Sequence, residues 1–581
     1  MSIVQAGGYC AMAAKKNPAP TNALYYGDNL EILREKIPTG TVDVCYIDPP
    51  FNSQQNYFQI YNDIKTKTPD RALAQAFTDT WEWNEQAIAG FNEILDNPNG
   101  RFTSQTVELI KGLHSSFGKG TPLLAYIVSL TQRITEIYRV LKPTGSFYLH
   151  CDPTASHYLK LVLDSVFLPQ GGDYKNEIIW RRTGSHNSGK SFGPIHDVIF
   201  FYTKSVKGFH FKTVKRSYMK GHVERRYTKD ETGRYKFTSG GNVLTGKDKR
   251  DKQSGLPWRG FDPTAKNRHW AIPGFLAEQM DNGFKDMGVI EKLDALYEAG
   301  LIEIKEGNVW PTPVRYLTDK SGLPLQDIWA FQPYTKGTVH GTQDGIDSDV
   351  KWLGPTSPER LGFQTQKPVG LLTRIIESSC PEAGIVLDAY CGCGTTIDTA
   401  QRLGRKWIGI DITYQSIIVV LDRLEKRYGK EFVESIGLNG IPKDMKSAVA
   451  LSQKKDDRLR KEFEKWAVLT YTKNRAVINE RKGADGGIDG IAFFKTGKNG
   501  NAKIVLQVKS GIVQRNDIAA LRGDMERVGA VMAVLITLKD PTKRMIQDAR
   551  EAGSYKHEYM GGSYDKSNYS RLFESLVLYL A

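Results

Sequence analysis

The feature that most constrains this fold is the stretch 385–411, "IVLDAYCGCGTTIDTAQRLGRKWIGID". It reads as an apolar run, a glycine-rich turn, a helical pattern and a second apolar run. Two strands separated by one helix are expected to lie parallel in the same sheet. The same alternation appears within residues 20–204, in runs such as "VDVCYID" and "GSFYLHCD". The sequence therefore predicts an α/β fold.

Composition changes along the chain indicate five segments. A Gly-rich, basic and aromatic block separates two α/β-like stretches, and a charged stretch precedes a final α/β-like block. We expect segment boundaries at 20–204, 205–350, 351–430, 431–458 and 459–581, with the fourth segment acting as a linker.

Bulk composition is that of a globular protein, with 40% hydrophobic and 25% charged residues among 581. The six cysteines show no CxxC spacing, which predicts a reducing cytoplasmic setting. No apolar run approaches the roughly 20 residues of a membrane span. The first twenty residues lack a basic stretch before an apolar core, so we expect no signal peptide.

A short stretch, "YIDPPFN", follows the apolar run 42–47. Asp48 is followed by Pro49 and Pro50, whose fixed φ angles stiffen the backbone directly after a carboxylate. Phe51 completes the stretch with an aromatic face. Taken alone, it reads equally well as a rigid strand-to-loop turn.

The glycine-rich turn after residue 388 has the form of a ligand loop. Gly392 and Gly394 permit positive φ and close approach of the backbone, and the turn opens a helix with free N–H groups. Asp411 ends the following strand, where nucleotide-binding units place an acid near ribose hydroxyls. Cys391 and Cys393 read as small loop fillers because they have no partner ligands nearby.

These motifs together resemble the amino-group DNA methyltransferase family of bacteria and their mobile elements. "DAYCGCGTT" resembles the family's loop for S-adenosylmethionine (SAM), "TQKPVGLLTRII" the motif before it, and "GDNLEIL" the early Gly-Asp motif. The resemblance implies a Rossmann-like SAM-dependent methyltransferase sheet with an inserted target-recognition region. It also implies that Lys367 and Pro368 lie near the methionine carboxylate of SAM and Asp28 near its adenine. The full set of implied SAM-binding residues is Asp28, Lys367, Pro368, Asp388, Tyr390, Gly392, Gly394, Thr395 and Asp411.

The same resemblance gives the "DPPF" stretch a chemical role. An exocyclic amine is a poor nucleophile because its lone pair is delocalised into the base. Acceptors from the Asp48 carboxylate and the Pro49 carbonyl would favour a localised lone pair, with Pro50 fixing the geometry. Phe51 would stack on a base flipped out of the duplex. A leading Asp usually accompanies adenine N6 in this family and Ser accompanies cytosine N4, which remains the alternative.

The order of the motifs resembles the permuted, β-type arrangement of such enzymes, with the target-recognition region between the two loops. Both loops are expected at the carboxyl ends of neighbouring parallel strands. Between Ser205 and Trp270 there are 17 Lys and Arg against 6 Asp and Glu, with aromatics interleaved. This block is expected to bind double-stranded DNA. A basic surface that only faces solvent would have the same composition.

The C-terminal block resembles the Mrr-like branch of the restriction-endonuclease fold. Asp489 precedes a strand that ends in Gln507-Val508-Lys509, and Glu464 lies upstream in "KEFEKWA". By resemblance, Asp489 would bind Mg²⁺ and Lys509 would position the attacking water. Active cleavage and a non-cleaving nuclease-like domain both fit this pattern.

The leading hypothesis is therefore a site-specific adenine-N6 DNA methyltransferase with a fused endonuclease-like α/β domain, in a restriction–modification or defence setting. A cytosine-N4 methyltransferase is one alternative. A DNA-cleaving defence protein that methylates for self-protection is another. SAM is the expected cofactor, with Mg²⁺ for the C-terminal domain. The expected location is the bacterial cytoplasm, at the nucleoid. The sequence leaves the oligomeric state open, a dimer included.

Overall fold

The computed structural model of the chain divides into two compact units, residues 1–212, 327–330 and 349–581, and residues 213–326 and 331–348. The described residues are 22–50, 56–60, 73–78, 81–118, 120–185, 190–238, 244–250, 252–307, 309–318, 321–361, 363, 365–441, 452, 457–472, 476–478, 487–496, 501–511, 513–538, 542–551, 553–556, 563–565 and 567–571.

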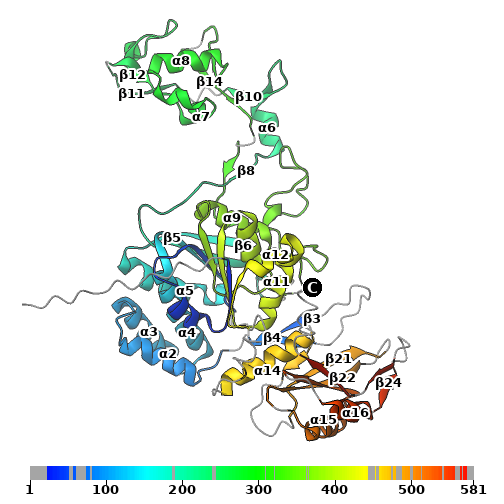
Figure 1. The fold of residues 1–581 in the computed structure, drawn as a ribbon. Coiled ribbons are helices and arrows are strands. Elements are labelled where there is room, and N and C mark those ends of the chain that lie inside the picture. Colours follow the sequence, from blue (N-terminus) through cyan, green and yellow to red (C-terminus); the bar gives the residue numbers. More distant parts are fainter. Residues whose placement is uncertain are drawn as a thin grey trace, which may run out of the picture. The chain divides into compact units, whose positions relative to one another are not determined.

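A nine-stranded mixed sheet forms the centre of the first unit (Figure 1). Strands β5, β2, β17, β18, β1 and β19 run parallel to one another, whereas β7 is antiparallel to both β5 and β6. In spatial order the strands are β16 (Ile328–Trp329), β6 (Asp173–Arg181), β7 (His196–Thr203), β5 (Leu141–Cys151), β2 (Val42–Ile47), β17 (Ile385–Asp388), β18 (Lys406–Asp411), β1 (Ala23–Tyr26) and β19 (Gly437–Asn439).

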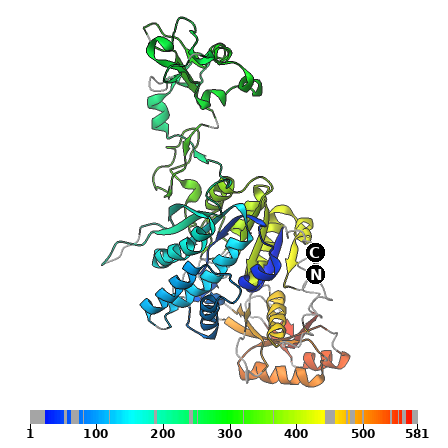
Figure 2. The same ribbon diagram turned by 90° about the vertical axis from the view of Figure 1, so that its left-hand side faces the viewer.

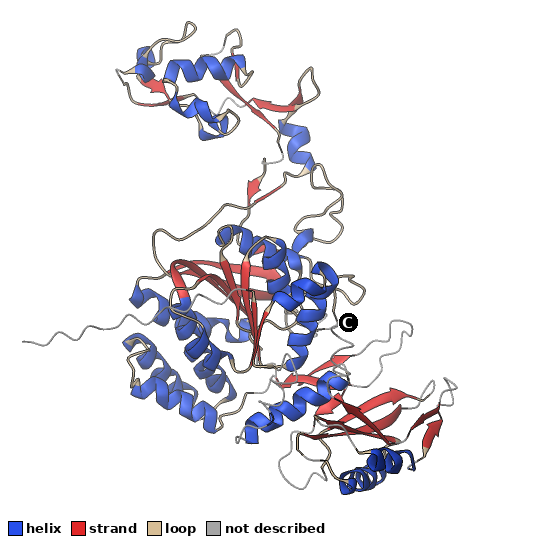
Figure 3. Cartoon of the chain, viewed as in Figure 1, coloured by secondary structure: helices blue, strands red, loops and turns tan. Residues whose placement is uncertain are grey.

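Helices cover both faces of this sheet, as Figure 3 shows with helices in blue and strands in red. One apolar cluster joins the sheet to α1, α2, α3, α4 and α5, and a second joins it to α9, α10 and α11. The α/β architecture predicted from the alternating pattern is confirmed. These helices are α1 (Asn29–Lys36), α2 (Glu85–Asp96), α3 (Ser104–Phe117), α4 (Pro122–Val140), α5 (Pro153–Phe167), α9 (Val369–Ser379), α10 (Thr395–Arg402), α11 (Tyr414–Tyr428) and α12 (Lys430–Ser435).

Local sequence explains where several of these helices begin. The Thr121 hydroxyl accepts from the N–H of Leu124, and Pro122 occupies the first turn of α4. Asp152 and Pro153 repeat this arrangement at α5. α4 is buried almost throughout its length, so its long run of buried side chains anchors one layer of the fold.

A second, five-stranded sheet forms the C-terminal part of the first unit, with order β20-β21-β22-β23-β26. Helix α14 packs on one face, and α15 and α16 pack on the other. Its elements are α14 (Asp457–Tyr471), β20 (Ala476–Ile478), β21 (Gly490–Lys495), β22 (Asn501–Lys509), α15 (Arg515–Arg527), β23 (Met532–Thr537), α16 (Lys543–Glu551), β24 (Ser554–Lys556), β25 (Ser563–Asp565) and β26 (Ser567–Arg571).

The two sheets of the first unit share one apolar core, because Phe463 and Trp466 of α14 belong to the cluster that includes α11. The hydroxyls of Tyr414 on α11 and Thr470 on α14 also form a buried hydrogen bond of 2.7 Å. A hairpin of β3 (Asn56–Ile60) and β4 (Leu73–Thr78) follows the "DPPF" stretch, and β4 contacts β20.

The second unit is a set of small sheets and short helices, seen from another side in Figure 2 in green. Its own core includes Trp258, Trp270, Leu293 and Leu296. Its elements are β8 (Lys215–Arg216), α6 (Lys220–Arg226), β9 (Thr228–Lys229), β10 (Tyr235–Thr238), β11 (Thr245–Lys247), β12 (Arg268–Trp270), α7 (Gly274–Ala277), α8 (Val289–Glu298), β13 (Ile302–Glu303), β14 (Thr312–Tyr316) and β15 (Leu323–Pro324).

Within the described part of the chain, none of the helices combines the length and the apolar character that crossing a membrane requires.

Candidate active site

The two loops singled out in the sequence lie at one edge of the central sheet. β2 ends one residue before Asp48, and its parallel neighbour β17 ends at Asp388. The register places Leu387 beside Cys45, so the two acids follow neighbouring strands at their carboxyl ends. Open α/β sheets bind ligands at this edge. The predicted adjacency of the two loops is confirmed.

Asp48 is held by a lysine from a distant part of the sequence. The Lys367 ammonium contacts the Asp48 carboxylate and donates to the carbonyl of Thr365 at 3.3 Å. The Lys367 and Asp48 side chains are 8% and 17% exposed, so this ion pair is largely desolvated. The expected place of Lys367 near the methionine carboxylate of SAM stays a prediction. Pro368 is the N-cap residue of α9.

The two prolines after Asp48 differ in exposure, since Pro49 is buried and Pro50 is half-buried. The fixed φ angles of Pro49 and Pro50 hold the carbonyl between them in place as a hydrogen-bond acceptor. Phe51, the expected stacking residue, lies outside the described residues, so its role stays a prediction.

The glycine-rich turn after β17 adopts left-handed backbone conformations, with φ of +49° at Gly392 and +74° at Gly394. The Asp411 carboxylate accepts from the Gly392 N–H at 2.9 Å and from the N–H and hydroxyl of Thr413. Asp411 therefore fixes the loop, which adds a structural task to its expected contact with ribose. Thr395 begins α10, and its buried hydroxyl accepts from Arg423 at 3.2 Å.

Asp388 is a buried acid among other acids. Burial, with a smaller contribution from the nearby charges of Asp48 and Asp411, raises its pKa to about 7 against the opposing effect of hydrogen bonds from Thr396 and from the Tyr390 N–H. Between about pH 4 and pH 7 the folded chain therefore keeps a proton that the unfolded chain has released. The contribution of this carboxyl to stability is greatest at low pH and is lost as pH rises through that window.

Asp28 caps α1, with its Oδ1 accepting from the N–H groups of Leu30 and Glu31. Its Oδ2 pairs with the largely buried Arg133 at 2.9 Å. Arg133 also donates to Asn29, whose amide donates to the Ala389 carbonyl in the glycine-rich loop. Side-chain hydrogen bonds thus connect the early Gly-Asp motif to the glycine-rich loop.

Sequence reasoning missed a buried network beneath Asp48. The Tyr46 hydroxyl lies 2.9 Å from His150 Nδ1, and His150 Nε2 lies 3.0 Å from the Asp197 carboxylate. Arg182 lies 3.3 Å from the second oxygen of Asp197. Burial would raise the pKa of Asp197, but His150, Lys367 and Arg182 lower it below its ordinary value. Tyr46, His150 and Asp197 lie on β2, β5 and β7, and Arg182 directly follows β6, so no local sequence pattern joins these residues.

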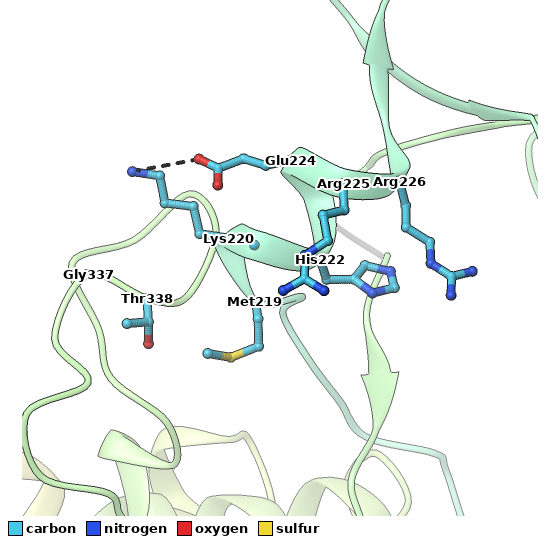
Figure 4. Close-up of a pocket in the computed structure, with 9 residues that line it drawn as sticks. Met219, Lys220, His222, Glu224, Arg225, Arg226, Gly337 and Thr338 are labelled. Atoms are coloured by element: carbon cyan, nitrogen blue, oxygen red, sulfur yellow. Dashed lines mark ion pairs between the residues drawn. The ribbon is translucent and has the colours of Figure 1, made fainter.

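The second unit presents a basic surface on α6 (Figure 4). Arg225 and Arg226 are exposed, and among the described residues neither forms an ion pair. Lys220 lies 4.0 Å from Glu224, and the His222 ring stacks on Tyr218 with ring centroids 4.7 Å apart. A surface pocket here is lined by Met219, Lys220, Gly221, His222, Glu224, Arg225, Arg226, Gly337 and Thr338.

The structure brings together part of the candidate nuclease site. The Asp489 carboxylate accepts from the main-chain N–H of Val508 at 2.7 Å, between Gln507 and Lys509. The Lys509 ammonium lies 3.5 Å from Asp517. Gln507 donates to the Gly487 carbonyl, and its buried Oε1 has no partner among the described residues.

Glu464 lies half-buried on α14, and its expected place in the nuclease-like site stays a prediction. The described residues contain no group of three or more His, Cys, Asp or Glu arranged to hold a metal ion. The metal role of Asp489 stays a prediction. Cys391 and Cys393 are buried free thiols, consistent with their reading as loop fillers.

Fold and site define a class of protein, an open α/β sheet with an acid–proline loop and a glycine-rich loop at the carboxyl ends of adjacent strands. Residues 42–419 match the model of the N6_N4_Mtase family, described as DNA methylase. The chain belongs to this family. Residues 459–560 match the model described as NACHT-associated inactive restriction endonuclease 1. This match supports a C-terminal domain of the restriction-endonuclease kind, and the finer resemblance to the Mrr-like branch stays a prediction.

Individual relatives agree with the family. The type II methyltransferase M.EcaI of Enterobacter cloacae is 26% identical over 301 residues, covering 52% of this chain and 57% of the relative. The type III restriction-modification enzyme StyLTI Mod subunit of Salmonella typhimurium is 25% identical, covering 67% of this chain and 51% of that protein. The type II methyltransferase M2.DpnII of Streptococcus pneumoniae is 48% identical over 180 residues, covering 27% of this chain and 66% of that protein.

The chain spans little more than half the length of the first two of these relatives. Among solved structures, the cytosine-N4-specific PvuII DNA methyltransferase is 12% identical, covers 73% of this chain and 98% of that chain, and gives a TM-score of 0.30.

The glycine-rich loop yields a test of its close packing. A Cβ added at Gly394 would lie 2.7 Å from Val420 Cγ2, whereas a Cβ at Gly404 would meet nothing within 4 Å. Both glycines have positive φ. We expect Gly394→Ala to lower the free energy of unfolding by about 1–3 kcal/mol more than Gly404→Ala, because overpacking adds to backbone strain. Urea unfolding monitored by tryptophan fluorescence measures both variants, and equal losses would contradict the close packing.

Proposed function

We propose that this chain transfers a methyl group from SAM to the N6 amino group of adenine in double-stranded DNA. The observation that carries the proposal is the position of Asp48 and Asp388 at the adjoining ends of β2 and β17. One acid is placed to receive an amine and the other lies in the loop for the cofactor. Family membership supports amino methylation, and the leading Asp favours adenine over cytosine.

The residues around the glycine-rich loop fit SAM. Positive φ at Gly392 and Gly394 lets the backbone approach a ligand, and α10 begins directly after the turn. SAM carries a sulfonium charge, and a cation near Asp388 would favour its carboxylate form over the neutral form that burial favours. Asp28, Pro368, Tyr390, Thr395 and Asp411 complete the proposed pocket.

Catalysis would depend on two hydrogen-bond acceptors held in fixed positions around the target amine. SAM supplies an electrophilic methyl group on a positively charged sulfur. The Asp48 carboxylate and the Pro49 carbonyl accept the two N–H bonds of the target amine, which localises its lone pair. Fixed acceptors contribute because they need no reorganisation as charge develops on the nitrogen. Asp48 can then take the proton that the methylated nitrogen releases.

The experiment for this function uses the full chain and its Asp48→Ala variant. Long-read modification sequencing of DNA from expressing cells should report N6-methyladenine at one recurring sequence for the wild type. Asp48→Ala should lose transfer and keep SAM binding by calorimetric titration, because the carboxylate acts on the amine. Nucleoside mass spectrometry showing N4-methylcytosine would support the cytosine alternative, and undiminished methyladenine in the variant would refute the role of Asp48.

We infer that the second unit supplies DNA contacts through α6. Arg225 and Arg226 are exposed and form no ion pair within the described part of the chain, so they are available to phosphates. Each phosphate contact steepens the salt dependence of binding. We expect Arg225→Ala and Arg226→Ala to reduce the log–log salt slope of DNA binding by about one unit each, with SAM affinity unchanged. Lys305→Ala is the control, because Glu303 already neutralises that charge. Fluorescence anisotropy of labelled DNA at several salt concentrations measures this slope. An unchanged slope in both variants would show that neither arginine contacts a DNA phosphate.

Metal-dependent cleavage is a second candidate function. The placement of Asp489 against the main chain between Gln507 and Lys509 favours it. The inactive-endonuclease family match and the Lys509–Asp517 contact weigh against it. If cleavage occurs, Lys509→Ala should abolish Mg²⁺-dependent nicking of plasmid DNA and leave methylation intact. Plasmid that stays uncut by wild-type protein in Mg²⁺ and Mn²⁺ would leave the domain without this activity.

The relatives described as type III restriction-modification subunits support a restriction–modification or defence role for the chain. Its setting would then be the bacterial cytoplasm.

A further inference from the structure

The contact between Lys367 and Asp48 has no counterpart in the role that family resemblance gives to Lys367. The two residues are 319 positions apart, and the loop before α9 brings the lysine to the end of β2. Both side chains are largely withdrawn from solvent. A solvated surface lysine would not account for this arrangement, because ordering and desolvating an ammonium group is costly unless it is paired.

The contact engages one oxygen of the carboxylate. Lys367 approaches Asp48 Oδ2, and the described residues provide no hydrogen-bond partner to Oδ1. A carboxylate pinned at one oxygen cannot rotate freely about its χ2 angle, which is otherwise a broad torsion. The remaining oxygen then points in a fixed direction as an acceptor.

The surroundings of Lys367 strengthen its hold on Asp48. Asp197 on β7 lies near enough for the lysine charge to contribute to its lowered pKa. Asp197 is itself fixed by His150 and Arg182. The Lys367 charge therefore acts on two carboxylates, one at the site and one in the network beneath it.

We propose that Lys367 is a positioning residue for methyl transfer, which holds the Asp48 carboxylate so that Oδ1 faces the target amine. This inference rests on the proposed function of Asp48. It replaces the expected contact of Lys367 with the methionine carboxylate of SAM. A misplacement of about 1 Å at a reacting group costs on the order of 100-fold in rate, so the loss of this contact should appear in the transfer step.

The test separates cofactor binding from transfer in the full-length chain. Lys367→Met keeps most of the side-chain length and removes the charge, and Lys367→Arg keeps the charge. SAM affinity is measured by calorimetric titration. The transfer rate is measured by single-turnover methylation of a DNA duplex that carries the recognition sequence, at saturating SAM. We expect Lys367→Met to retain SAM affinity within about twofold and to transfer roughly 100-fold more slowly. Lys367→Arg should recover part of that rate.

Lys142→Met is the matched control. Lys142 lies 2.7 Å from Asp43, a buried acid at the opposite end of the same strand β2. Both substitutions remove a lysine from a carboxylate on β2, and only Lys367 lies at the site. We expect Lys142→Met to lower thermal stability and to leave the transfer rate at saturating SAM within about twofold of the wild type.

The outcomes distinguish the possibilities. SAM affinity lowered tenfold or more in Lys367→Met, with an unchanged saturated transfer rate, would assign Lys367 to the cofactor and overturn the proposal. Equal rate losses in Lys367→Met and Lys142→Met would reduce it to a structural role. If Lys367→Met does not fold, Lys367→Arg decides by the same comparison of affinity and rate. A wild-type chain that methylates no DNA would overturn the proposed function and this inference with it.

Discussion

The parallel pairing of β2 with β17 is the constraint on which the rest of the site depends. Asp43 secures it at the amino ends of the strands, where its buried carboxylate accepts from the Ile385 N–H, 342 residues away, and from Lys142 on β5. A buried carboxylate is tolerated because these donors satisfy it, and removing a partner would leave an uncompensated charge. The Asp43–Ile385 hydrogen bond joins β2 to β17, and the register of these two strands carries Asp48 and Asp388 to the same edge. Lys142 neutralises the Asp43 carboxylate from β5.

That edge concentrates negative charge in a region shielded from water. Asp388 responds with a pKa near 7, and Asp48 is paired with Lys367. Asp411 is compensated by hydrogen bonds from the loop that it fixes. Three acids thus use three different means of stabilisation, namely protonation, ion pairing and hydrogen bonding. Burial raises the pKa of both Asp388 and Asp411, and that of Asp388 reaches about 7.

The sequence predicted the parts of this site that depend on local chemistry. Consecutive prolines after an acid and glycines with positive φ impose backbone geometry on their own residues, so "DPPF" and "GCG" are readable without a structure. The adjacency of β2 and β17 followed from the order of motifs. The contacts of Lys367 and the network around His150 were beyond reach, because such pairings are decided by which strands and loops meet in space. Lys367 shows the difference, since its motif was recognised and its partner was not.

The C-terminal sheet is part of the same physical body as the methyltransferase sheet. Phe463 and Trp466 on α14 are buried in the core that also holds α11, and the buried Tyr414–Thr470 hydrogen bond lies within it. Tyr414 is the first residue of α11 and follows Asp411 by three positions. Removing α14 would expose the apolar side chains that it covers and would break the Tyr414–Thr470 hydrogen bond. A nuclease-like domain without cleavage would therefore still contribute to the methyltransferase, because it covers the helix that follows the proposed cofactor-binding strand.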